Sequence, residues 1–71
     1  MRDREELIYD LIFSDAVDYN IDISEYVDDI YKHEEFISDI KKILKKSKVN
    51  VLHSSIEVDS KTVVWKLKVK K

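Results

Sequence analysis

The chain of 71 residues is predicted to form a single α+β domain over residues 1–71, with two or three N-terminal helices followed by a C-terminal antiparallel β-hairpin. Two observations predict this class. Apolar residues recur at helical spacing as far as about residue 47, and beyond Lys48 they alternate with polar residues, which is the period of a strand. The chain also lacks glycine, proline and cysteine. We therefore expect capped helices and one hairpin, with no turn that needs the backbone geometry of glycine.

The first helix is predicted over residues 5–19. Asp3 and Glu6 have the spacing of a capping box, in which both side chains satisfy amides of the first turn. Its apolar residues cover about 280° of the circumference at 100° per residue, far more than one core-facing stripe. Tyr9, Phe13 and Val17 form a second stripe that needs a cover. Either later elements of the chain wrap around this stripe, or a second copy packs on it to form a homodimer.

A second helix is predicted over residues 23–31, because Asp22 and Glu25 repeat the capping-box spacing. The apolar spacing also fits one continuous helix over residues 23–47. We prefer a break near His33, because a single long rod would leave a small core poorly enclosed.

The last helix is predicted over residues 34–47. Glu34 and Glu35 in its first turn favour the helix dipole, as do lysines near its end. One face is apolar, and the other carries Ser38, Lys41, Lys42, Lys45 and Lys46.

Two strands are predicted over residues 49–58 and 62–70, with a turn at residues 59–61. An isolated hairpin is unstable, so the side of the second strand that carries Trp65 must pack on the helices. The residues of that side are Val63, Trp65, Leu67 and Val69. On the first strand, Leu52, Ile56 and Val58 are expected to face the same core.

The composition argues against an enzyme. Without glycine there is no phosphate-binding loop, and without cysteine there is no disulfide, zinc finger or thiol nucleophile. His33 is followed by two glutamates, but Ile37 stands where a zinc protease has its second histidine. Asp29 and His33 could form a weak divalent site with Asp22 and Glu25, but we prefer to interpret them as an ordinary solvated acidic helix face. We predict no catalytic residue, no metal and no cofactor.

No apolar run is long enough for a membrane span and no signal peptide opens the chain, so we expect a cytoplasmic protein with no membrane partner.

Charge is distributed very unequally along the chain. Residues 1–36 hold twelve acidic and three basic residues, whereas residues 37–71 hold three acidic and ten basic residues. The two halves could attract each other, within one molecule or between copies. Alternatively, the basic half forms a surface for phosphate, since lysine binding to nucleic acid releases counterions. The residues predicted to bind nucleic acid are Lys41, Lys42, Lys45, Lys46, Lys48 and Lys61.

The order of elements resembles the winged helix-turn-helix family. In this resemblance residues 21–23 correspond to the small first strand, residues 34–47 to the recognition helix and residues 59–61 to the tip of the wing. It implies a DNA-binding transcription regulator that contacts duplex DNA through the last helix and the wing. The sequence departs from the pattern at Glu34 and Glu35, which stand where base-reading residues usually lie.

The alternative function is a protein-interaction module, such as an inhibitor or adaptor of a host protein. Such a module would use Tyr9, Phe13 and Val17, or would present the acidic helical half as a mimic of nucleic acid.

Overall fold

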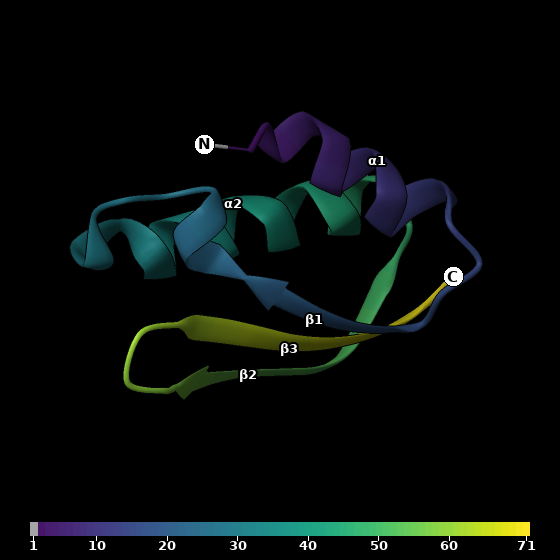
Figure 1. Ribbon diagram of the computed structural model, residues 1–71. Coiled ribbons are helices and arrows are strands. Elements are labelled where there is room, and N and C mark those ends of the chain that lie inside the picture. The colour runs from purple at the N-terminus through teal and green to yellow at the C-terminus, as the bar shows by residue number, and fades with distance from the viewer. Residues whose placement is uncertain (1) are drawn as a thin grey trace.

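The computed structural model describes residues 2–71 and confirms the α+β class, with two α-helices and a three-stranded antiparallel sheet. Both helices lie on the same face of the sheet (Figure 1). The elements are α1 (Arg4–Phe13), β1 (Asp18–Asp22), the 3₁₀ turns η1 (Ile23–Glu25) and η2 (Ile30–Lys32), α2 (His33–Lys46), β2 (Asn50–Val58) and β3 (Val63–Lys70). No helix among residues 2–71 is long and apolar enough to cross a membrane.

The strand order is β1-β3-β2, so the last strand of the chain is the central strand of the sheet. Asp18 of β1 lies opposite Lys68, and Val58 of β2 lies opposite Val63. The β2–β3 register shifts between Val51 and His53, which marks a bulge. Because β3 is central, β1 and β2 each have an outer edge that faces away from the sheet.

The core lies between β3 and the two helices. Trp65 of β3 is fully buried, as the alternation of the strand predicts, and its indole Nε1 donates a hydrogen bond to the hydroxyl of Ser54 at 2.8 Å. The other large, fully buried side chains are Leu11, Ile23, Ile40, Leu44 and Val69. The core therefore draws on both helices, η1 and the central strand.

The first helix is shorter than predicted, because α1 ends at Phe13 rather than at residue 19. Asp3 caps it, accepting a hydrogen bond from the Glu5 amide, so the predicted capping box is confirmed for Asp3. Among residues 2–71 no hydrogen bond of the Glu6 side chain completes it. Beyond Ser14 the chain turns and pairs with β3, and the carbonyl of Val17 accepts from the amide of Val69. These long-range sheet bonds outweigh the local helical pattern, which contains no information about them.

The predicted helix over residues 23–31 is also wrong. Asp22 accepts from the Ser24 amide and Asp29 accepts from the Tyr31 amide, but each cap opens only a short 3₁₀ turn. The break before α2 is confirmed, so residues 23–47 are not one helix. His33 begins α2 as a buried residue, and its Nε2 lies 3.2 Å from the Val27 carbonyl oxygen.

Helix α2 and the hairpin agree with prediction to within about one residue at each end. The exception is the side chains of β2. Leu52, Ile56 and Val58 are 57%, 42% and 73% exposed, rather than buried in the core. Leu52 lies at the bulge, Val58 lies beside the turn, and a groove stays open between Ile56 and α2.

Candidate functional site

The lysine surface, defined as Lys41, Lys42, Lys45, Lys46 and Lys48, lies on the solvent side of α2 and just beyond its end. All five residues are exposed. They occupy this side because the opposite side of α2 is buried against the sheet and α1. The buried residues of α2 are His33, Phe36, Ile37, Ile40 and Leu44.

Lys48 holds a conformation that the sequence does not predict. Its φ is 62°, in the left-handed region where glycine is usual. The Val49 amide donates to the Leu44 carbonyl and the Lys48 amide donates to the Lys45 carbonyl, which is the Schellman pattern of a helix end. Val49 and Leu44 are both buried, which adds the apolar contact typical of that motif. The expectation that no turn requires the geometry of glycine is therefore wrong at Lys48.

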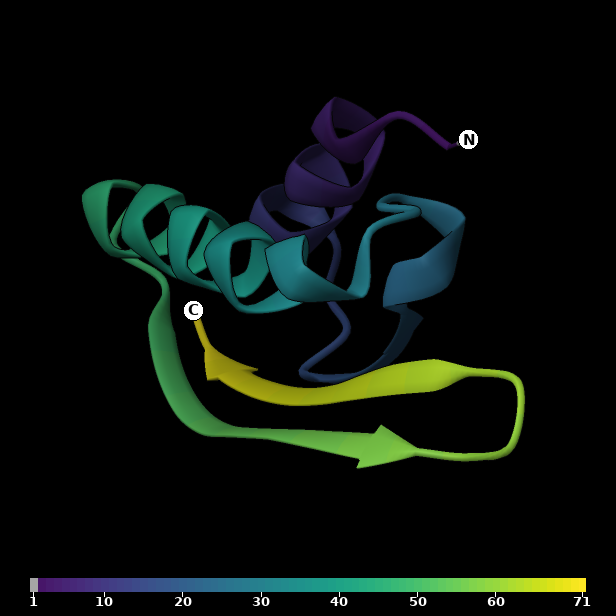
Figure 2. The ribbon, with the colours of Figure 1, turned by 90° about the vertical axis from the view of Figure 1, so that its left-hand side faces the viewer.

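Lys61 is separated from the lysine surface. It lies at the hairpin tip, near the end of the molecule where α2 begins, whereas the lysine surface extends toward the end where α2 finishes (Figure 2). The remaining lysines of β3 alternate with the buried residues of that strand and project from the other face of the sheet. They are Lys66, Lys68 and Lys70.

The lysine surface is not neutralised within the molecule. Among residues 2–71 the ion pairs within 4.0 Å are Arg2–Glu25 at 3.1 Å, Arg4–Asp39 at 3.8 Å and Lys66–Glu57 at 3.0 Å. None of them includes a residue of the lysine surface. None of these ion pairs joins an acidic residue of the N-terminal half to a lysine of the C-terminal half.

An aromatic patch lies on the outer side of α1. The rings of Tyr9 and Phe13 have centroids 4.7 Å apart, and these two side chains are 65% and 67% exposed. Val17, the third predicted member, is also exposed but lies beyond the end of α1. Later elements of the chain do not wrap around this patch, so that interpretation is wrong.

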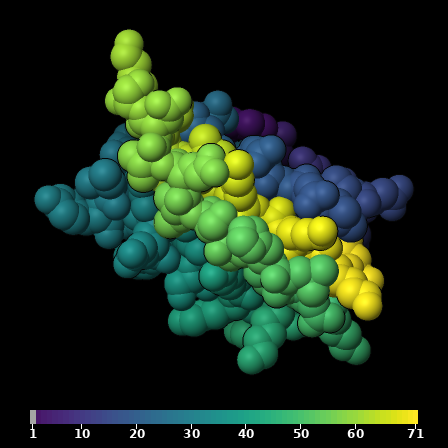
Figure 3. All heavy atoms as spheres, turned by 90° about the horizontal axis from the view of Figure 1, so that it is seen from below, coloured from purple at the N-terminus to yellow at the C-terminus, as the bar shows by residue number. Residues whose placement is uncertain are grey.

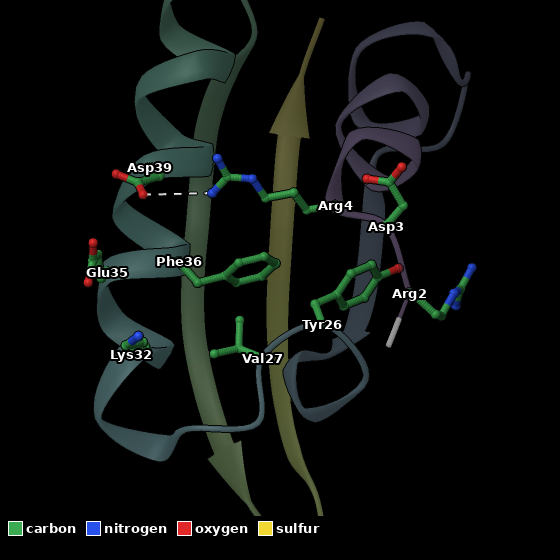
Figure 4. Close-up of a pocket in the computed structure, with 9 residues that line it drawn as sticks. All are labelled: Arg2, Asp3, Arg4, Tyr26, Val27, Lys32, Glu35, Phe36 and Asp39. Carbon is green, nitrogen blue, oxygen red and sulfur yellow. Dashed lines mark ion pairs between the residues drawn. The ribbon is translucent and has the colours of Figure 1, made fainter.

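A pocket of about 350 Å³ lies between α1 and α2 (Figure 4). Its floor is formed by Tyr26 and Phe36, whose rings stack with centroids 5.7 Å apart. Arg4 and Asp39 face each other across it, and Arg2 lies 5.5 Å from the centre of the Tyr26 ring. Since acidic and basic groups alternate around the opening, the pocket has no single charge that would select a ligand.

Two pKa values in this region are shifted. Burial raises the pKa of the Tyr26 phenol, and the neighbouring Arg2 guanidinium opposes that rise. The hydrogen bond that Arg2 donates to Glu25 raises the pKa of Arg2. The sequence does not predict that Arg2 lies beside Glu25 and Tyr26. Their contact depends on the extended segment before α1 packing against η1.

A second groove, called the edge groove here, lies between α2 and β2. Ile37, Ser38 and Lys41 of α2 face Ser54, Ser55 and Ile56 of β2 across a space of about 420 Å³. The groove continues along β2 between Lys45 and Val51. The sequence does not reveal this groove, because the alternation of β2 is the same for a buried strand, with Ile56 in the core, and for a half-covered edge strand.

Among residues 2–71 there is no group of three or more His, Asp or Glu side chains placed to hold a metal ion. No family model, no curated protein and no solved structure matches the chain, so its own residues are what bear on its function.

Proposed function

We propose that this chain is a non-enzymatic protein that binds duplex DNA through the lysine surface. The observation that carries the proposal is the set of five exposed lysines within residues 41–48, none with a carboxylate partner among the described residues. Such a surface binds phosphates by releasing their counterions. The twelve acidic residues of the N-terminal half repel DNA, so only the basic end can approach.

The layout of the chain supports a winged-helix type of binding. The hairpin follows α2 directly, and the strand order is β1-β3-β2, with β1 in the position of the small first strand. Two features depart from this plan. The place of a second helix is taken by η1 and η2, and Lys61 lies apart from the lysine surface. We therefore assign the contact to the C-terminal half of α2 rather than to the hairpin tip.

Binding through this surface is expected to tolerate many DNA sequences. Residues 37–71 contain no arginine, and arginine makes the commonest specific contact, which is to guanine. Lysine contacts to phosphate position a protein but do not read bases.

The test is fluorescence anisotropy of a labelled duplex at about 50 mM salt, comparing Lys46→Glu with Lys70→Glu. Both changes remove one positive charge and add one negative charge, but Lys70 projects from the other face of the sheet. The proposal expects Lys46→Glu to weaken binding at least about tenfold and Lys70→Glu to have a much smaller effect. No binding by the unaltered chain, or equal losses in both variants, would contradict the proposal.

A second candidate function is protein interaction through the aromatic patch, with a second copy or a host protein as the partner. The exposed Tyr9–Phe13 ring pair favours it, since aromatic residues are enriched at the centres of protein interfaces. Sedimentation equilibrium tests the homodimer, with Phe13→Asp as the disrupting variant and Asp10→Asn as a control on the same helix. A monomer at all concentrations would exclude the second copy and leave a host protein as the partner to be sought.

A further inference from the structure

We propose that the edge groove binds an extended acidic peptide, which adds to β2 as a fourth strand of the sheet beneath α2. This inference goes beyond DNA binding and stands or falls separately from it. It rests on unpaired backbone groups along β2, on the shape of the groove and on the charge of its α2 side.

Alternate residues of β3 direct their backbone hydrogen bonds toward β1 and toward β2, and this alternation shows which backbone groups of β2 are unpaired. The amide of Val69 donates to Val17, so Val69 and every second residue before it bond toward β1. The intervening residues of β3 bond toward β2. They are Lys68, Lys66 and Val64, and their register partners are His53, Ser55 and Glu57.

The alternate residues of β2 therefore direct their N–H and C=O groups to the outer edge. These residues are Ser54, Ile56 and Val58. The backbone hydrogen bonds found among residues 2–71 outside the regular elements include none to this edge. The strand is nine residues long and carries no lysine or proline, which commonly protect an edge from pairing. It has the length and the free groups that a bound strand requires.

The shape of the groove selects an extended peptide. Seen from the outer face of the sheet, atoms of α2 extend beyond the edge of β2 (Figure 3). If β2 of a second copy paired antiparallel with this edge, its own α2 would lie on the same face of the sheet and meet the first one. A peptide without a helix above it fits beneath α2, where Ile37 and Ile56 offer apolar contacts.

The charge of the groove selects an acidic peptide. Lys41 lines both parts of the groove, and Lys45 lines the part beside Val51. Neither lysine has a carboxylate partner within 4.0 Å among the described residues. Glu34 is the acidic residue of the lining, at the end away from Lys45. Carboxylates of the peptide would pair with the two lysines, while its backbone bonds to Ser54 and Ile56.

The probe is a fluorescein-labelled peptide of about ten residues that repeats Glu-Glu-Val-Val, so that each face of the bound strand carries both residue types. The control peptide has lysine in place of glutamate. We expect the acidic peptide to bind and the basic one to bind at least about tenfold more weakly. Lys41→Glu should weaken binding of the acidic peptide at least about tenfold, whereas Lys42→Glu, on the same helix but outside the groove lining, should leave it nearly unchanged. DNA binding should fall in both variants, which separates this proposal from the previous one.

Amide hydrogen exchange tests the pairing of the backbone. Adding the acidic peptide should slow exchange of the Ile56 amide and leave the Ser55 amide, already bonded to β3, nearly unchanged. Ile56→Pro, which removes an outward N–H, should abolish binding, while Ile56→Val should keep it. If Ile56→Pro does not fold, the exchange experiment and the comparison of Lys41→Glu with Lys42→Glu still test the proposal. No binding at about 1 mM peptide, equal binding of both peptides, unchanged Ile56 exchange, or dimerisation of the chain through β2 would each overturn the proposal.

Discussion

The indole of Trp65 and the hydroxyl of Ser54 are joined by a hydrogen bond of 2.8 Å that links the central strand to the edge strand from inside the molecule. A fully buried tryptophan needs a partner for its N–H, and here the edge strand supplies it. The contact ties β2 to β3 beside the edge groove, of which Ser54 is a lining residue.

Removing the Ser54 hydroxyl should destabilise the fold. Ser54→Ala leaves the buried indole N–H without its partner, which costs about 1–3 kcal/mol of the free energy of unfolding. In the Trp65→Phe background the indole N–H is absent, so Ser54→Ala should lower the free energy of unfolding much less. Urea denaturation followed by far-UV circular dichroism measures both, and equal costs in the two backgrounds would show that the hydrogen bond does not contribute.

Replacing Lys48 by glycine should stabilise the fold. Its φ of 62° strains a side chain that has a Cβ, and glycine removes that strain. Lys48→Gly should raise the free energy of unfolding by about 0.5–1 kcal/mol. Lys48→Ala removes the same charge but keeps the Cβ, so thermal unfolding should separate the two variants. If alanine stabilises as much as glycine, the gain comes from the lost charge and not from the backbone.

The two sides of α1 should respond differently to truncation. Leu11 is fully buried, so Leu11→Ala should cost about 2–5 kcal/mol. Phe13→Ala should cost below about 1 kcal/mol, because its ring packs mainly on Tyr9 at the surface. Chemical denaturation compares the variants at low protein concentration. A large loss in Phe13→Ala would mean that the patch belongs to the core.

Tyr26 should make the fold sensitive to alkaline pH. Burial raises its pKa in the folded state, so the phenol ionises more readily in the unfolded chain. Its contribution to stability is complete below the ordinary tyrosine pKa of about 10 and is lost as the pH rises through the folded value. Tyr26→Phe should therefore lose less stability than the unaltered chain between pH 9 and 11 or so. Tyr31→Phe, at an exposed position, is the control and should follow the unaltered chain.

The sequence predicts the parts of the fold that depend on local patterns. Helix α2 and the hairpin follow from helical and strand periods, and Asp3 and Asp22 act as caps where their spacing indicates. Strand β1 could not be predicted in the same way, because its residues pair with β3 more than forty positions away in the chain. The caps at Asp22 and Asp29 show where a turn of helix begins but contain no information about how far it continues.

The candidate site likewise has parts that local sequence patterns predict and parts that depend on the tertiary fold. Four residues of the lysine surface share one face because the period of one helix places them there, and Lys48 follows just beyond the helix end. Lys61 could not be placed relative to them, since its distance from the end of α2 depends on the path of the hairpin across the sheet (Figure 2). The edge groove depends on how far α2 extends past β2, a tertiary feature that no local spacing encodes.

Binding of DNA phosphates by the lysine surface should show in the salt dependence of the affinity. Five lysine–phosphate contacts predict a slope of about −4.5 for the logarithm of the binding constant against the logarithm of the salt concentration. Lys46→Gln should make that slope shallower by about 0.9. A slope near zero, or a slope unchanged in Lys46→Gln, would show that these lysines do not bind DNA phosphates.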